Sequence, residues 1–222
     1  MAKLIIFGAG GFAREVQLLC EDLGLEVVGF LDERPEMKGK IVNGIPILGD
    51  ISDVDHYLSV SRLVRSEVEI VCAGVGDPAL KQKFVKKTLH SGYKIAQTLV
   101  HPDVRVSKWN TLGQGSIICQ GTVLTVNITV GDFVIINQNC SLGHGDTIMD
   151  YVTVSPGANI SGMVTIGVGT FIGTGVGIRE NISIGEWCVI GGNAFVKDSV
   201  PNRSLFAGVP AVMKKAIVDR DK

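Results

Sequence analysis

The sequence predicts an α/β Rossmann-like N-terminal domain followed by a parallel β-solenoid built on a hexapeptide repeat. Strand and helix patterns alternate in the first hundred residues, and from Val106 to Val196 every sixth residue is aliphatic. A chain of 222 residues, of which 45% are hydrophobic, is long enough to bury two such cores. The pattern changes near His101, so we expect one domain over 1–100 and a second over 101–222.

Composition excludes several classes of partner. The net charge is −1 and the basic residues are scattered, so we expect no nucleic-acid partner. No segment approaches the roughly 20 apolar residues of a membrane span, so we expect no membrane partner. Five widely spaced cysteines without a C-x-x-C pair favour neither a zinc site nor a disulfide framework. These features predict a cytoplasmic protein.

The elements of the N-terminal half follow from hydrophobic runs and turn residues. "LIIF" predicts a short buried strand, and "GAGGFAREVQLLCEDLG" predicts a glycine turn that opens an amphipathic helix ending at Gly24. "EVVGFLD" predicts a second strand that ends at Asp32, and "EIVCAGVGD" a further strand and loop. "PALKQKFVKKTLHSG" predicts a helix with proline in its first turn and glycine after its end.

The second half repeats every six residues. All sixteen positions from Val106 to Val196 in steps of six are Ile, Leu or Val, and three residues after them ten positions are Gly or Asn. Gly and Asn tolerate the left-handed backbone of a corner. Two residues before each aliphatic the side chain is mostly small or β-branched, which suits a narrow interior; Cys140 and Cys188 are therefore expected to fill the core. Three hexapeptides make one coil.

A glycine loop follows the first strand. Gly8, Gly10, Gly11 and Ala13 match G-x-G-x-x-A between strand and helix, and Asp32 stands about twenty residues on. Three interpretations stay open: a dinucleotide such as NAD, the diphosphate of a nucleotide-linked sugar, and a tight turn without a ligand. The nucleotide-linked sugar is favoured, because the solenoid leaves no domain for nicotinamide chemistry. Gly76, in a second loop at a strand end, is expected to line the same crevice.

Taken in order, several motifs resemble the NeuD-type sugar acyltransferase family, close to the bacterial N-acetyltransferases of nucleotide-linked 4-amino sugars. The resemblance covers the whole chain. It rests on "IIFGAGGFAREV", "FLDE", "AGVGD", "HPDVRVS", "IIN" followed by a histidine, "DYVTVSPGANISG" and "FAGVPA". It implies a left-handed parallel β-helix, acetyl-CoA as donor, no metal, and a homotrimer with active sites between subunits. The acceptor implied is a nucleotide-linked amino sugar used in polysaccharide synthesis.

The resemblance also implies roles for residues around "LGHGDTIMDY". His144, two residues after Leu142, is expected at a corner with its side chain outward, as the general base. Gly162, one coil later, is the expected backbone donor to the oxyanion and a contact of the cofactor. The family often has an acidic residue directly after the histidine, whereas here Asp146 is the nearest carboxylate, and it either orients the imidazole or faces the core.

Further contacts are implied with donor and acceptor. Asn137 either contacts the sugar or supports a corner, and Thr153 replaces a second family histidine near the cofactor. The "AGVPA" segment resembles a loop that closes over coenzyme A. The remaining expected cofactor contacts are Thr174, Gly192, Gly208 and Pro210.

Two other function classes stay open. A sugar O-acetyltransferase of the sialic-acid type would use the same base and donor. A non-catalytic solenoid would be either a scaffold or a carbonic-anhydrase-like metal trimer, and the latter needs three histidines at an interface. A scaffold would not require His144, Gly162 and "AGVPA" together.

Overall fold

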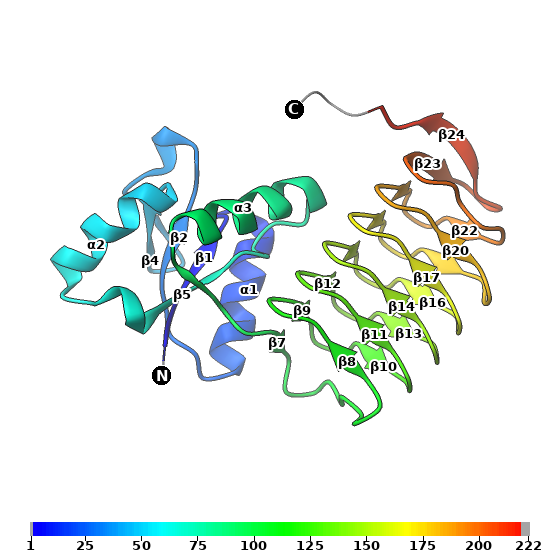
Figure 1. The fold of residues 1–222 in the computed structure, drawn as a ribbon, viewed down its shortest axis with the longest axis horizontal. Coiled ribbons are helices and arrows are strands. Elements are labelled where there is room, and N and C mark those ends of the chain that lie inside the picture. The colour runs from blue at the N-terminus through cyan, green and yellow to red at the C-terminus, as the bar shows by residue number, and fades with distance from the viewer. Residues whose placement is uncertain (1, 219–222) are drawn as a thin grey trace. The chain divides into compact units, whose positions relative to one another are not determined.

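The computed structural model describes residues 2–218, which form two compact units divided between Leu99 and Val100 (Figure 1). We call residues 2–99 the N-terminal domain and residues 100–218 the repeat domain.

The N-terminal domain is built on a six-stranded sheet in the order β3-β4-β2-β1-β5-β6. Every pair is parallel apart from the β3–β4 hairpin, which confirms the Rossmann-like prediction. The strands are β1 (Lys3–Phe7), β2 (Val27–Leu31), β3 (Ile41–Val42), β4 (Ile45–Gly49), β5 (Val68–Val71) and β6 (Lys94–Ile95). The helices are α1 (Gly11–Asp22), α2 (Val54–Ser61) and α3 (Pro78–His90), with short 3₁₀ turns at Pro35–Met37, Ile51–Asp53 and Arg65–Glu67.

Helices α1 and α3 end close to where their sequence signals predict. Helix α1 buries Ala13, Val16 and Leu19, the apolar face of the predicted amphipathic helix. In α3 the Asp77 side chain caps the helix by accepting a hydrogen bond from the Leu80 N–H at 2.8 Å. This cap fixes the loop that follows β5.

The repeat domain consists of three sheets of short, parallel strands, and from β7 to β23 successive strands along the chain belong to different sheets (Figure 1). The first sheet holds β10 (Val123–Leu124), β13 (Ser141–Leu142), β16 (Asn159–Ile160), β19 (Gly177–Ile178) and β22 (Phe195–Val196). The second holds β8 (Thr111–Leu112), β11 (Thr129–Val130), β14 (Thr147–Ile148), β17 (Thr165–Ile166) and β20 (Ser183–Ile184). The third holds β7 (Leu99–Val100), β9 (Ile117–Ile118), β12 (Ile135–Ile136), β15 (Thr153–Val154), β18 (Phe171–Ile172), β21 (Val189–Ile190), β23 (Ser204–Ala207) and the antiparallel β24 (Val212–Ala216).

The aliphatic repeat forms the core of these sheets. Each strand pairs with the strand eighteen residues away, so Leu142 lies beside Ile160, and Ile160 beside Ile178. From β9 to β22, the second residue of each strand is buried in the core. Burying one such side chain contributes roughly 1.5–3 kcal/mol, so the stack is the main source of stability. Cys140 and Cys188 lie in this core, as the repeat predicts.

The predicted start of the repeat was wrong. Val106 is 40% exposed, residues 101–110 form no strand, and Val104 packs in the core instead. The backbone N–H groups here are used in local turns: that of Val104 donates to the His101 carbonyl at 2.9 Å, and that of Asn110 to Ser107 at 3.0 Å. These two groups do not pair with a neighbouring coil, and the second sheet begins only at β8.

The corners use left-handed backbone at more positions than the glycine and asparagine pattern predicts. All the predicted Gly and Asn corners have positive φ. Four bulky residues adopt the same conformation, with φ between 53° and 61°: Phe133, Tyr151, Met163 and Trp187. Two of them stack, the rings of Phe133 and Tyr151 lying 5.4 Å apart. Contacts between successive corners therefore compensate the unfavourable backbone conformation.

Candidate active site

His144 lies at the corner between β13 and β14, and its side chain is exposed, as the repeat predicts. The corner is held by the backbone on both sides: the Gly143 N–H donates to Ile160 at 2.9 Å, and the Gly145 N–H donates to Val126 at 3.0 Å. Gly145 has φ of +72°, the left-handed conformation that the turn requires. The imidazole is thus carried outward on a rigid backbone.

Gly162 lies directly against the imidazole. A Cβ atom on Gly162 would stand 2.7 Å from Nε2 and 2.8 Å from Cε1 of His144. Any larger residue at this position would therefore displace the imidazole ring. The Met163 N–H donates to the His144 carbonyl at 2.8 Å, which fixes the two corners to each other. Within residues 2–218, the Gly162 N–H donates to no acceptor. The structure therefore places a free amide beside a free imidazole.

Asp146 does not contact His144 as an orienting residue would. Its side chain is fully buried; Oδ1 accepts a hydrogen bond from the Val164 N–H at 2.9 Å, and Oδ2 has no partner among the described residues. Two residues before a core aliphatic, the backbone directs the side chain inward, so the alternative that Asp146 faces the core is the one observed. Burial raises the pKa of this carboxyl to about 7, opposed by the hydrogen bond from Val164.

We expect Asp146→Asn to remove a pH dependence of stability. The pKa of the Asp146 carboxyl is about 7 in the folded chain and 3.8 when it is fully solvated. Between these two pH values the carboxyl is protonated in the folded state and ionised in the unfolded state. The free energy of unfolding of the wild type should then fall as pH rises from about 4 to about 7, by up to about 4 kcal/mol. Urea unfolding of both proteins over this pH range measures the difference, and parallel curves would contradict the expectation.

The proposed cofactor contacts lie farther along the repeat domain. Thr174 and Gly192 stack on successive coils, with the Asn193 N–H donating to the Thr174 carbonyl at 2.8 Å, and both residues are exposed. Gly208 and Pro210 are exposed in the turn between β23 and β24. Thr153 lies in β15 and is buried.

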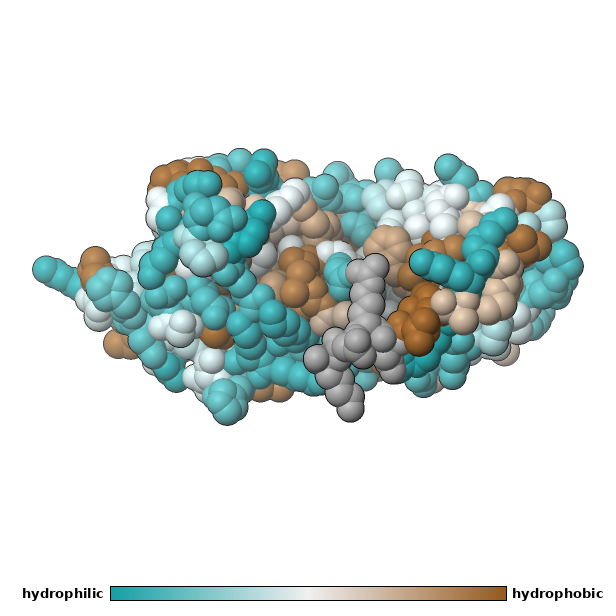
Figure 2. All heavy atoms as spheres, turned by 90° about the horizontal axis from the view of Figure 1, so that it is seen from above, coloured by the Kyte–Doolittle hydropathy of each residue, from teal (hydrophilic) through white to brown (hydrophobic). Residues whose placement is uncertain are grey.

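The hairpin formed by β23 and β24 carries exposed hydrophobic side chains. Val209, Val212 and Met213 are at least half exposed. Figure 2 shows such hydrophobic side chains interspersed with polar ones over the face that it presents.

Asn137 is used by the coil itself. Its side-chain Nδ2 donates to the Val154 carbonyl at 2.8 Å. The backbone carbonyl of Asn137 accepts a hydrogen bond from the Thr122 hydroxyl, also at 2.8 Å. The side chain is buried. These contacts favour the corner-supporting interpretation over a contact with the sugar.

The glycine loop of the N-terminal domain lies where β1 and β5 end together. Gly8 has φ of +114°, and a Cβ there would approach the Gly74 carbonyl oxygen to 2.8 Å, so Gly8 is required by packing. Gly10 and Gly11 differ, because nothing lies within 4 Å of an added Cβ at either position. Gly10 caps helix α1 without a side-chain hydrogen bond. Among the described residues the first amides of α1 have no acceptor and both glycines are exposed, the arrangement that binds phosphate at a helix N-terminus.

Asp32 follows β2 directly and lies beside this loop, because the Gly8 N–H donates to the Leu31 carbonyl at 2.8 Å. Both of its carboxylate oxygens are engaged by Arg34, at 2.9 Å from Nε and 2.7 Å from Nη2. The Arg34 hydrogen bonds lower the pKa of Asp32. Gly76 lies in the loop after β5, whose Gly74 contacts Gly8. The structure therefore brings the predicted loops together.

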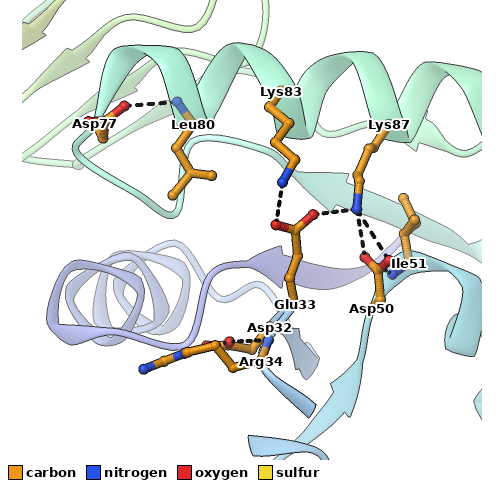
Figure 3. A network of polar contacts seen from close by, with 9 residues as sticks. All are labelled: Asp32, Glu33, Arg34, Asp50, Ile51, Asp77, Leu80, Lys83 and Lys87. Atoms are coloured by element: carbon orange, nitrogen blue, oxygen red, sulfur yellow. Dashed lines mark hydrogen bonds and ion pairs between the residues drawn. The ribbon is translucent and has the colours of Figure 1, made fainter. Parts of the chain in front are cut away.

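Charged residues next to Asp32 form a network that the sequence analysis missed (Figure 3). Glu33 accepts hydrogen bonds from Lys83 at 2.6 Å and from Lys87, and Lys87 also pairs with Asp50 at 3.2 Å. The two lysines stand one turn apart on α3, so their spacing was a usable signal. The network links the end of β2 to α3.

The described part of the chain offers neither a cluster of metal ligands nor a membrane-spanning helix. Residues 2–218 contain no group of three His, Cys, Asp or Glu side chains placed to hold a metal ion. None of their helices combines the length and the apolar character that crossing a membrane requires.

Comparison with known proteins gives matches for both halves. Residues 3–88 match the family model described as the PglD N-terminal domain. The acetyltransferase domain of PglB from Neisseria gonorrhoeae FA1090, solved with acetyl coenzyme A, is 30% identical, with a TM-score of 0.79 over 95% of this chain and 98% of that chain.

Two further solved structures cover almost the whole chain. A mutant of perosamine N-acetyltransferase from Caulobacter crescentus, in complex with CoA and GDP-perosamine, is 26% identical, with a TM-score of 0.86 over 97% of this chain and 98% of that chain. WeeI from Acinetobacter baumannii AYE is 27% identical, with a TM-score of 0.82 over 96% and 100%. The curated proteins give no match.

Proposed function

Since the chain belongs to the NeuD-type sugar acyltransferase family, we propose that it moves an acetyl group from acetyl-CoA to the amino group of a nucleotide-linked, 4-amino-deoxy sugar. Membership makes the chain an enzyme that uses acetyl-CoA as its co-substrate. The observation that carries the proposal is the stacking of the His144 imidazole on Gly162, beside a backbone amide without an acceptor.

The chemistry is direct acyl transfer. The sugar amine attacks the thioester carbonyl, a C–N bond forms, and Nε2 of His144 accepts the proton that the nitrogen sheds. The Gly162 N–H donates to the oxyanion of the tetrahedral intermediate, which collapses as the C–S bond breaks. The coenzyme A thiolate then takes the proton from the imidazolium, so the base is restored. The exposed Thr174, Gly192, Gly208 and Pro210 hold coenzyme A with Gly162, whereas the predicted contact through Thr153 is dropped because that side chain is buried.

The acceptor is assigned to the N-terminal domain through its diphosphate. GDP-perosamine, bound in the Caulobacter enzyme, is a nucleotide-linked amino sugar. Here the open amides at Gly10 and Gly11 supply donors for a diphosphate, and the Asp32–Arg34 pair supplies polar groups beside it. Gly76 lines the same crevice.

We expect Gly10→Ala to weaken acceptor binding alone. Gly10 has φ of −80° and ψ of −169°, which alanine adopts freely, and nothing lies near its Cβ position. The added methyl group blocks close approach of the diphosphate to the amides, so KM for the nucleotide sugar should rise about tenfold. KM for acetyl-CoA, measured in the same assay, is the control and should not change. An unaltered KM for the sugar would contradict the assignment of this loop.

The assembly follows the family. We propose that the three sheets form a left-handed parallel β-helix of the hexapeptide-repeat type, that three chains associate with active sites between subunits, and that the enzyme works in the cytoplasm in polysaccharide synthesis. The five cysteines are free and buried, which suits a reducing compartment. NMR of the purified product tests the reaction type: an N-acetyl amide supports the proposal, and an O-acetyl ester contradicts it.

A further inference from the structure

Small polar side chains inside the repeat domain follow one hydrogen-bonding rule. We call these positions, two residues before each core aliphatic, the inner column. In it the hydroxyl donates to the carbonyl fifteen residues later: Ser116 to Gly131 at 2.9 Å, Thr122 to Asn137 at 2.8 Å and Thr170 to Gly185 at 2.7 Å. Two of them also accept a hydrogen bond from the amide eighteen residues later, Ser116 from Val134 at 2.9 Å and Thr170 from Cys188 at 3.0 Å.

Asp146 occupies the inner column and makes only one of the two hydrogen bonds of this pattern. Its Oδ1 accepts from the Val164 N–H, eighteen residues later, at 2.9 Å. Its Oδ2 is buried and has no partner, although the rule assigns it the carbonyl of Ser161, fifteen residues later. Within residues 2–218, that carbonyl accepts no other hydrogen bond. An ionised carboxylate has no proton to donate to it, whereas a neutral carboxylic acid has one.

The Ser161 carbonyl belongs to the same peptide group as the Gly162 N–H. We propose that Asp146 is a positioning residue: as a neutral acid it donates from Oδ2 to the Ser161 carbonyl, and thereby orients and polarises the Gly162 N–H as the oxyanion donor. Hydrogen bonds in a chain strengthen one another, and here the chain runs from the buried acid through one peptide unit to the reacting oxygen. The inference rests on the proposed function.

The surroundings of Asp146 keep it neutral. The stacked corners on either side, residues 125–128 and 161–164, and the adjoining strands β10, β11, β13, β14, β16 and β17 contain no Asp, Glu, Lys, Arg or His. His144 is therefore the one other such group in the three corners. Burial without a charged partner raises the pKa of Asp146 to about 7. When Asp146 ionises, its Oδ2 turns from donor to acceptor facing a carbonyl, so kcat should decline as pH rises through this pKa.

Two substitutions separate positioning from packing. Asp146→Asn keeps both bonds, because its amide NH₂ donates to Ser161 and its oxygen accepts from Val164, and it has no proton to lose. Asp146→Val fits the inner column, where Val134 and Val152 stand at equivalent positions, but it supplies no donor. We expect Asn to keep kcat within about threefold and to lose the decline at high pH, and Val to lower kcat about tenfold at unchanged KM for both substrates. Equal kcat in wild type and Val, or an equal loss in Asn and Val, would overturn the inference.

Infrared difference spectroscopy gives a measurement independent of turnover. At about pH 5 the wild type should show the C=O band of a protonated carboxylic acid that is missing in Asp146→Asn, and the band should vanish as pH rises past about 7. Absence of this band would overturn the inference even with full acetyltransferase activity. Presence of the band in a protein that acetylates no amino sugar would instead refute the proposed function, and with it the assigned purpose of Asp146.

Discussion

His144→Ala should lower kcat for acetyl transfer by about 10²- to 10⁴-fold, the usual contribution of a general base. The amine must lose a proton as the C–N bond forms, and within residues 2–218 the imidazole is the sole basic side chain in the stacked corners 125–128, 143–146 and 161–164. The side chain is exposed and supports no described hydrogen bond of the core, so the variant should fold normally. KM for acetyl-CoA should stay close to that of the wild type.

A matched control comes from the N-terminal domain. His56 is exposed on α2 and has no role in the proposed chemistry, so His56→Ala should keep the wild-type kcat. Steady-state rates of thiol release measure all three proteins. A His144→Ala protein with wild-type kcat would show that the histidine is only a corner residue.

Gly162→Ala should lower kcat about a hundredfold, the effect expected when a catalytic group is misplaced by about 1 Å. The new Cβ would stand 2.7 Å from Nε2 and 2.8 Å from Cε1 of His144, distances too short for a Cβ contact, so the imidazole must move. Gly162 does not use left-handed backbone, so alanine introduces no strain of its own.

The double variant tests whether this loss acts through the imidazole. In a His144→Ala background the alanine at 162 has no ring to displace, so it should add much less than its single effect. Fully additive losses would mean that Gly162→Ala damages the oxyanion donor or the coil instead. Thermal unfolding of each variant should match the wild type, which separates catalysis from folding.

The sequence predicts the elements that depend on periodicity. Strict spacing of aliphatics implies the three-sheet core, and a repeat of eighteen residues per coil brings His144 and Gly162 together without any tertiary information. Glycine loops at strand ends likewise predict that Gly8 and Gly74 meet, because parallel strands end at one edge of a sheet.

What periodicity alone does not determine is local competition between contacts. Val106 has the correct spacing, but it lies outside any strand and is 40% exposed, while Val104 packs in the core. Trp187 occupies a left-handed corner because it packs against Gly169 on the preceding coil, a contact invisible in a single hexapeptide. Asp146 resembles a partner for His144 in sequence, yet the alternation of inward and outward positions turns it to the core.

The most direct test is release of coenzyme A thiol from acetyl-CoA with UDP-, GDP- and dTDP-linked 4-amino sugars, with the wild type and His144→Ala side by side. The account predicts turnover on at least one of these sugars and a loss of at least about a hundredfold in the variant. Turnover only on hydroxyl acceptors, or turnover that His144→Ala leaves unchanged, would contradict it.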